Sequence, residues 1–250
     1  KPWPEDVASR VKQGDVVFVM TEELKAFFEN VHPKIQCRYI LLTHNSDYPI
    51  PGTFGQYLDD PKIIAWFGQN VEGVYHPKLF PVPIGIANRR WKHGNVAMVD
   101  EMRKQSCNAV KDILLYMNFS SNTHPERDLV YNIFAKKSFC FVGGRIDPQK
   151  HLGELARSRF VLSPRGNGLD CHRTWEALYM GSIPVVRTSA MDSLFVDLPV
   201  LIVYDWNDVT QSFLEQAYQQ IAVKTYRFEK LFIEYWKKEI EKIKQNALAM

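Results

Sequence analysis

One segment near the middle of the sequence predicts most of the architecture: Phe160-Val-Leu-Ser-Pro-Arg-Gly-Asn-Gly-Leu-Asp-Cys-His-Arg-Thr-Trp-Glu-Ala-Leu-Tyr-Met-Gly-Ser-Ile-Pro-Val-Val186. An apolar run leads into a Gly-rich basic loop, and the loop opens a helix that carries Arg173 and Glu176. The helix is expected to end at Gly181, and a second apolar strand follows at 183–186. This order predicts a βαβ unit whose first strand ends in a polar, cationic crevice. Open α/β sheets bind anionic ligands there, and these groups suit a nucleotide diphosphate.

Apolar runs alternate with helical stretches on both sides of this segment, which is typical of parallel α/β architecture. Strands are expected at residues 15–20, 38–43, 74–75, 112–117, 139–142 and 200–203, and Pro81 and Pro83 make 79–85 an edge or irregular segment. Helices are expected at 21–30, 96–109, 125–135 and 149–158, with 57–68 as a short helix or loop and one more helix from Phe213 to the end. We predict two Rossmann-like α/β domains, 1–100 and 101–250, that face each other across a cleft. The C-terminal helix can pack back on the first domain.

The composition is that of an ordinary folded protein. The chain has 250 residues, of which 46% are hydrophobic and 24% are charged, and its formal net charge is +3. The charges form no basic stripe, so we predict no nucleic-acid partner. No window is long and apolar enough to span a membrane, and the first residues lack signal-peptide character. We expect a soluble cytoplasmic protein, or alternatively a Golgi-lumenal domain whose anchor has been trimmed.

The cysteines give no sign of a metal site, because none lies in a CxxC pair or in a Cys/His cluster with zinc spacing. Scattered single cysteines fit buried thiols in a reducing compartment, with one or two disulfides as the alternative. These residues are Cys37, Cys107, Cys140 and Cys171.

The loop at 163–168 carries residues that are suited to hold phosphate. Gly166 permits close approach of the backbone to a ligand, and Arg165 offers a planar fork of donors to phosphate oxygens. Ser163 and Asn167 add a hydroxyl and an amide. The alternative is an ordinary βα turn with a surface arginine. The position of the loop directly after an apolar strand favours binding.

The helix that follows adds a cation and a carboxylate. Arg173 and Glu176 are spaced to project on one side of the helix, so Arg173 can reach a pyrophosphate and Glu176 the ribose hydroxyls. An exposed ion pair between them fits the spacing equally well. Asp170 is expected to cap the helix, which begins near Cys171. His172 is either a ligand to phosphate or sugar, or a structural residue.

Two further loops extend this candidate site. The polar loop at 118–127 follows a predicted strand and precedes a helix, so Ser120, Arg127 and its N–H groups can cradle phosphate. Simple capping of that helix by Thr123 explains the loop equally well. Arg145 comes after a Gly-Gly pair that follows another strand, and it would lie on the same rim.

A longer pattern in this region resembles the core signature of exostosin-type glycosyltransferases (glycosyltransferase family 47). It reads Pro164-Arg165-Gly166-x-x-Leu169-x-x-x-Arg173-x-x-Glu176-Ala177-Leu178, followed by Ile183-Pro184-Val185. The match covers residues 160–186, with weaker similarity over 112–205. The chain departs from the family at Cys171, where a Ser is common, and has Asp170 beside it.

The resemblance implies a GT-B fold with an acceptor-side domain at 1–100 and a nucleotide-sugar-binding domain at 101–250. It implies inverting transfer of a sugar from a UDP-sugar to an oligosaccharide or glycoprotein-glycan acceptor. Members of the family use several donors, and among these we favour UDP-xylose or another UDP-pentose or UDP-hexose. Arg165 and Arg173 would bind the diphosphate, and Glu176 the ribose or donor sugar. The sequence contains no Asp-x-Asp motif, so we expect the UDP-sugar as co-substrate and no divalent metal cofactor. Arginines and helix N-termini would then stabilise the leaving UDP.

Inverting transfer also needs a general base that takes the proton of the acceptor hydroxyl. The polar cluster after the strand at 38–43 offers Asp47 and His44, and Glu72 is a third candidate. Asp47 ranks first because of its place at the carboxyl end of a strand. A loop Asx-turn is the alternative reading of this aspartate.

Other classes of protein fit less well. A dehydrogenase would need a G-x-G-x-x-G motif after an early strand, and a P-loop NTPase would need G-x-x-x-x-G-K-[ST]; the sequence has neither. A non-catalytic nucleotide- or carbohydrate-binding protein stays open, because an aromatic content of 13% would serve sugar stacking as well as catalysis.

Overall fold

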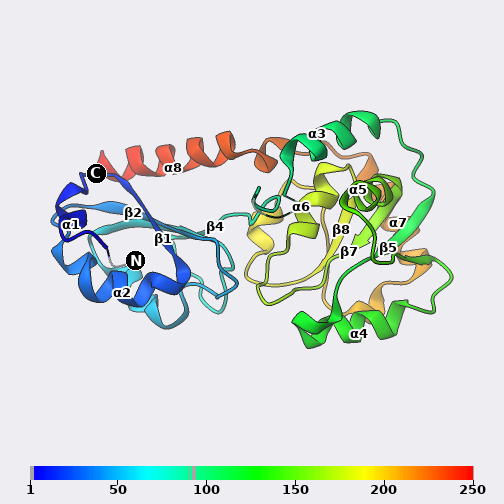
Figure 1. The fold of residues 1–250 in the computed structure, drawn as a ribbon, viewed down its shortest axis with the longest axis horizontal. Helices are drawn as coiled ribbons and strands as arrows, with labels where there is room; N and C mark the ends of the chain where they lie inside the picture. The colour runs from blue at the N-terminus through cyan, green and yellow to red at the C-terminus, as the bar shows by residue number, and fades with distance from the viewer. Residues whose placement is uncertain (1–2, 90, 92–93, 250) are drawn as a thin grey trace. The chain divides into compact units, whose positions relative to one another are not determined.

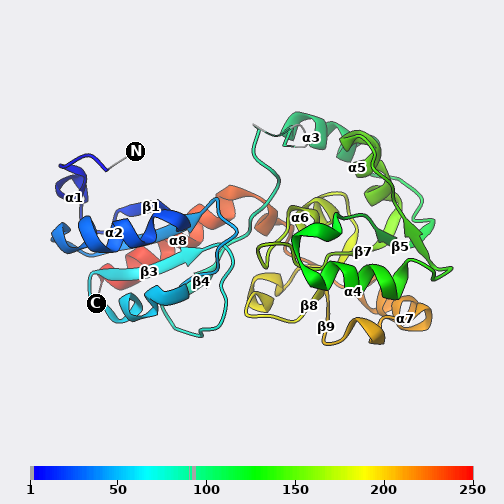
Figure 2. The same cartoon turned by 60° about the horizontal axis from the view of Figure 1, so that its bottom comes forward.

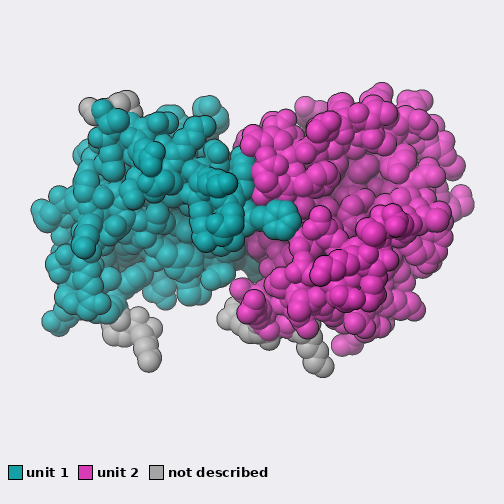
Figure 3. All heavy atoms as spheres, turned by 90° about the horizontal axis from the view of Figure 1, so that it is seen from above, with its two compact units in different colours: residues 1–83, 232–250 teal, residues 84–231 magenta. Residues whose placement is uncertain are grey.

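The computed structural model describes residues 3–89, 91 and 94–249, which form two compact units, coloured separately in Figure 3. Unit 1 contains residues 1–83 and 232–250, and unit 2 contains residues 84–231. The chain therefore leaves unit 1 and later returns to it. Residue 100, where the sequence places the boundary, lies within helix α3 (Val96–Gln105), whose Val99 is buried in the core of unit 2.

Unit 1 is built on a four-stranded parallel sheet with the order β1-β2-β3-β4. Its strands are β1 (Val16–Met20), β2 (Tyr39–His44), β3 (Ile63–Gly68) and β4 (Leu79–Pro81). Its helices are α1 (Val7–Arg10), α2 (Leu24–Asn30) and α8 (Ile233–Leu248), with the 3-10 helices η1 (Thr21–Glu23), η2 (His32–Lys34) and η3 (Gly52–Asp59). Helices α2 and α8 lie on opposite faces of the sheet (Figure 1).

Strand β3 corrects the prediction of a helix or loop at 57–68. All six residues of the strand are buried, and the 3-10 helix η3 ends before it. A strand that is covered on both faces reads as a continuous apolar run rather than as an alternation, so periodicity does not separate it from a buried helix. The strand predicted at 74–75 is also wrong. Val74 is 39% and Tyr75 98% exposed, and neither belongs to a strand.

Helix α8, from the C-terminal end of the sequence, covers one face of the sheet of unit 1. Its partly buried apolar residues recur at helical spacing and pack on buried residues of β2 and β3, among them Ile40 and Phe67. These helix residues are Trp236, Ile240, Ile243 and Ala247. The prediction of one helix from Phe213 to the end is wrong, because α7 ends at Ala222 and α8 begins at Ile233.

Unit 2 is built on a five-stranded parallel sheet with the order β6-β5-β7-β8-β9. Its strands are β5 (Ile113–Met117), β6 (Cys140–Val142), β7 (Ser158–Leu162), β8 (Ile183–Arg187) and β9 (Leu201–Val203). Its helices are α3 (Val96–Gln105), α4 (Pro125–Phe134), α5 (Pro148–Arg157), α6 (His172–Tyr179) and α7 (Gln211–Ala222), with η4 (Ser121–Thr123), η5 (Asp192–Phe195), η6 (Trp206–Asp208) and η7 (Phe228–Leu231).

Helices cover both faces of the unit 2 sheet (Figure 2). Helices α4 and α7 pack with Leu115 and Leu162 in one core cluster, and α3, α5 and α6 pack with Tyr116 and Val161 in another. Neighbouring residues of one strand thus point to opposite cores, as the pleat requires. The predicted α/β class, with two parallel sheets and a C-terminal helix, is confirmed.

The strand order defines a topological switch point in unit 2. The chain passes from β5 to β6 on one side and returns to β7 on the other side of β5. In doubly wound sheets of this order, ligands bind outside the carboxyl ends of the two strands at the switch. The loops that begin at Asn118 and Ser163 follow these two strands, so the predicted phosphate loops are neighbours.

Two further expectations concern thiols and membranes. All four cysteines are free, and Cys107 is exposed whereas Cys140 and Cys171 are buried. Within the described ranges, no helix has both the length and the apolar character that a bilayer crossing needs.

Candidate functional site

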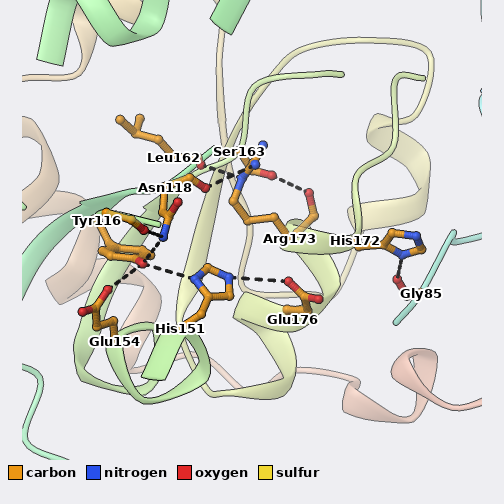
Figure 4. Close-up of polar contacts among 12 residues, drawn as sticks. Gly85, Tyr116, Asn118, His151, Glu154, Leu162, Ser163, His172, Arg173 and Glu176 are labelled. Atoms are coloured by element: carbon orange, nitrogen blue, oxygen red, sulfur yellow. Dashed lines mark hydrogen bonds and ion pairs between the residues drawn. The ribbon is translucent and has the colours of Figure 1, made fainter. Parts of the chain in front are cut away.

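Arg173 joins the ends of the two strands at the switch point (Figure 4). It lies in the first turn of α6, and its guanidinium donates from Nε to the Leu162 carbonyl at 3.1 Å and from Nη2 to the Pro164 carbonyl at 3.0 Å. Nη1 donates to the Asn118 carbonyl at 3.5 Å, on the loop after β5. Arg173 therefore fixes the spacing of the two loops at which a ligand would bind.

Arg127 joins the same two loops from helix α4. Its guanidinium donates from Nε to the Arg165 carbonyl at 3.0 Å and from Nη1 to the Ser120 carbonyl at 2.9 Å. Nη2 approaches the Cys171 sulfur at 3.6 Å. Two arginines from different helices thus brace one pair of loops.

Both guanidinium groups are buried with neutral partners. Arg127 is 9% and Arg173 8% exposed, and neither forms an ion pair with any carboxylate in the described part of the chain. Burial lowers the pKa of Arg173 to about 10, and the charge of Arg127 lowers it as well. The side chain remains a cation at neutral pH. Two buried cations that form no close ion pair within the described residues are a favourable place for an anion.

Gly166 gives Arg127 the room that it needs. A Cβ on this buried residue would lie 2.7 Å from Arg127 Nη2. We expect Gly166→Ala to displace the guanidinium and to lower the free energy of unfolding by about 1–3 kcal/mol. Denaturant unfolding measures this change. Gly144→Ala is the matched control, since nothing lies within 4 Å of its Cβ position; equal stability of the two variants would contradict the prediction.

The other residues of the Gly-rich loop have mixed roles. The Ser163 hydroxyl is buried and bonds the Thr174 hydroxyl at 2.8 Å, so it attaches the loop to α6. Asn167 is exposed, and its carbonyl lies 3.4 Å from Arg165 Nη2. Of the predicted ligands on this loop, Arg165 and Asn167 therefore lie nearer to solvent than Ser163.

Asp170 does not cap helix α6, contrary to the prediction. The helix begins at His172 with Cys171 as N-cap. The Asp170 carboxylate instead accepts the N–H of Ile84 at 2.7 Å, the N–H of Cys171 at 2.9 Å and the indole N–H of Trp175 at 2.8 Å. Burial raises the pKa of Asp170 to about 7, against the effect of these donors. Asp170 is an internal anchor, which removes it from the surface that a pyrophosphate would touch.

His172 makes a second attachment to the same incoming segment. Its Nδ1 lies 2.7 Å from the Gly85 carbonyl, so this nitrogen carries the proton and donates (Figure 4). The contact fixes the ring plane at the start of α6. A structural role for His172 is thus established beside the predicted role in ligand binding.

The loop after β5 supplies the remaining predicted residues. The Ser120 hydroxyl bonds the Asn122 side chain at 2.6 Å, and its carbonyl accepts from Arg127. His124 caps α4 through its side chain, so the suggested cap by Thr123 is wrong. The buried Thr123 hydroxyl has no hydrogen-bond partner among the described residues and lies 3.6 Å from the Cβ position of Gly166. Arg145 is exposed in the loop after β6.

Glu176 belongs to a partly buried polar network that the sequence did not predict (Figure 4). Its Oε2 lies 3.7 Å from Nε2 of His151, and Nδ1 of His151 lies 3.2 Å from the Tyr116 hydroxyl. That hydroxyl donates to Glu154 at 2.7 Å and accepts from Asn118 at 2.9 Å. The sequence feature that could have indicated this network is the spacing of His151 and Glu154, which lie three residues apart on one face of α5.

The candidates for the general base lie in unit 1. His44 ends β2, and its Nε2 lies 3.0 Å from the Pro83 carbonyl and its Nδ1 3.2 Å from Asn45 Oδ1. Asp47 is exposed in the following loop, and Glu72 follows Val71 near the end of β3. The structure gives Asp47 the more accessible carboxylate, whereas both ring nitrogens of His44 face oxygen atoms.

Potential metal ligands are dispersed. In residues 3–89, 91 and 94–249, no three His, Cys, Asp or Glu side chains come together in a group that could hold a metal ion.

The switch point of unit 2, with its two braced loops, defines the class of the fold: a doubly wound α/β protein. The sequence model of the family described as RXYLT1 C-terminal domain matches residues 92–250. The chain belongs to this family, and through it has a glycosyltransferase relationship. No curated protein sequence matches.

Several solved structures are similar to the chain. OtsA, in its apo form, has a TM-score of 0.48 at 12% identity, over 96% of this chain and 73% of its own. The pneumococcal O-GlcNAc transferase GtfA, in complex with UDP and GlcNAc, has a TM-score of 0.43 at 14% identity, over 94% of this chain and 58% of its own. AviGT4, a glycosyltransferase involved in avilamycin A biosynthesis, has a TM-score of 0.38 at 12% identity, over 89% of this chain and 88% of its own.

Proposed function

We propose that this chain is an inverting, metal-independent glycosyltransferase of the exostosin type. It transfers a sugar from a UDP-sugar to a hydroxyl group of a glycan acceptor. The observation that supports this most is the pair of buried cations, Arg127 and Arg173, which face neutral partners at the switch point. A diphosphate at that point would supply the missing negative charge, and the same cations would stabilise it as the leaving group.

The residues around the two arginines fit the rest of a nucleotide-sugar. Arg165, Asn167 and Arg145 lie on the loops of the same sheet edge and can reach phosphate oxygens from the solvent side. Glu176 offers a carboxylate that can accept hydrogen bonds from ribose or sugar hydroxyls. UDP-xylose is the favoured donor and a glycan the acceptor. A cytoplasmic or Golgi-lumenal location stays a prediction from the sequence.

Two binding experiments separate the proposal from its alternatives. Saturating UDP is expected to stabilise the protein against heat by several degrees, whereas NAD leaves the melting temperature unchanged. Release of UDP from a panel of UDP-sugars, in the presence of glycan acceptors, then tests transfer. Stabilisation by UDP without transfer to any acceptor would favour a non-catalytic binding protein. No response to millimolar UDP would overturn the proposed function.

Asp47 is the proposed general base. Asp47→Ala is expected to reduce transfer by roughly 100- to 10,000-fold, the usual effect of losing proton abstraction, while the affinity for UDP stays nearly unchanged. Turnover and UDP titration calorimetry on the same preparation measure both. Asp59→Ala, at a carboxylate that is 86% exposed in the same unit, is the matched control and should keep wild-type turnover. Normal turnover of Asp47→Ala would remove this residue from the mechanism.

A further inference from the structure

Four side chains near the switch point form a row of polar contacts, and the proton in each contact can be assigned to one of the two atoms. Glu154, Tyr116, His151 and Glu176 follow one another at 2.7, 3.2 and 3.7 Å. All four belong to unit 2 and come from β5, α5 and α6. Figure 4 shows them in sequence, with Glu176 at one end and Glu154 at the other.

The position of each proton follows from the donors available. Burial raises the pKa of Tyr116, so its hydroxyl stays protonated. At 2.7 Å from a carboxylate, which can only accept, that proton points to Glu154. The tyrosine oxygen then accepts from Asn118, whose amide nitrogen also donates to the Gly144 carbonyl at 3.1 Å and is therefore assigned without ambiguity. Nδ1 of His151 must be a donor to the same oxygen.

The protonation of the other ring nitrogen, Nε2, decides whether the His151 ring is neutral or positively charged. With a proton on Nδ1, a neutral imidazole would turn the lone pair of Nε2 toward the Glu176 carboxylate at 3.7 Å, which is repulsive. A second ring proton converts this contact into an ion pair.

We propose that His151 and Glu176 hold one proton between them, and that His151 is thereby the positioning residue for the Glu176 carboxylate. This inference rests on the proposed function, in which Glu176 binds the ribose or sugar of the donor. The ion pair keeps the Glu176 carboxylate turned toward His151 in a fixed rotamer. The hydrogen bond between His151 Nδ1 and the Tyr116 hydroxyl fixes the plane of the imidazole. His151 itself does not touch the donor.

The first test reads the proton directly, in the full chain and without any ligand. Ring 15N resonances of His151 are expected to show both nitrogens protonated at pH 7 in the wild type. In Glu176→Gln the ring is expected to be neutral, with its proton on Nδ1. His76, which faces the exposed Asp59 at 3.3 Å, is the internal reference ring. A neutral His151 in the wild type would overturn the shared proton.

The second test reads the effect on the donor. His151→Gln is expected to weaken binding of UDP-sugar by roughly tenfold, while the affinity for inorganic pyrophosphate, which needs the arginines alone, stays unchanged. In a Glu176→Gln background the same change should have little further effect, because its partner is already lost. Equal losses for pyrophosphate and UDP-sugar would indicate general damage to the site and overturn the positioning role.

The two tests separate failure of this inference from failure of the proposed function. If the wild type binds pyrophosphate but no UDP-sugar, the proposed function fails, while the 15N spectra still decide the protonation of His151. If UDP-sugar binds and the ring is neutral, the function stands and the inference fails. Tyr116→Phe offers a second variant with intact packing, and it should release the imidazole and reproduce the loss seen with His151→Gln.

Discussion

Arg173→Met is expected to weaken binding of UDP by at least about 100-fold and to lower the free energy of unfolding by about 2–5 kcal/mol. The buried guanidinium donates to the carbonyls of Leu162, Pro164 and Asn118, and methionine removes this donor from all three. The loops on either side of the switch point would then lose their common brace. Denaturant unfolding and titration calorimetry with UDP measure the two effects.

Two control variants show which property of the arginine matters. Arg173→Lys keeps the positive charge but cannot reach three carbonyls in different directions, so it should restore part of the UDP affinity and little of the stability. Arg157→Met removes an exposed arginine that pairs with Asp112, and it should leave the free energy of unfolding nearly unchanged. Wild-type stability and affinity in Arg173→Met would show that the brace is dispensable.

Ile240→Asp is expected to unfold much of unit 1, at a cost of about 3 kcal/mol or more. Ile240 lies on the face of α8 that packs on the sheet, in a cluster with Ile40, Ala65 and Phe67. A carboxylate there would be placed against apolar side chains without a donor. Hydrogen exchange should report lost protection in β2 and β3, while the amides of β5 and β7 stay protected because they belong to unit 2.

Lys238→Asp is the matched control for this variant, because it introduces the same residue on the exposed side of the same helix. Its effect on protection in β2 and β3 should be small. If Ile240→Asp leaves those strands as protected as in the wild type, then α8 is not needed to cover the sheet.

The central segment was predictable because local signals agree along it. Apolar runs mark β7 and β8, and Gly181 ends helix α6 with a φ of 73°, a conformation that favours glycine. Strand β3 was missed because burial on both faces removes the alternation that identifies a strand. Helix α8, which covers β3, is far from it in the sequence. The local sequence around Trp236 and Ile240 does not show which sheet the helix covers.

The sequence predicts which residues lie on the loops at the switch point, but not the contacts that these residues make. Arg173 and Glu176 are both buried, so the reading of an exposed ion pair is wrong. Instead, Arg173 bonds carbonyl groups and Glu176 faces His151. These partners depend on the strand order, which places β5 next to β7 and brings Arg127 to the Gly-rich loop. A single sequence does not give that order, because it follows from how the sheet assembles.

The route of the chain through the two units affects the order in which they can fold during synthesis. Unit 2 is one continuous stretch, 84–231, and all of it leaves the ribosome before α8 is made. The sheet of unit 1 emerges first but waits for residues 233–248 before its second face is covered. The sheet of unit 1 is therefore completed only after unit 2 has been translated, and until then the apolar face that α8 covers is exposed to aggregation.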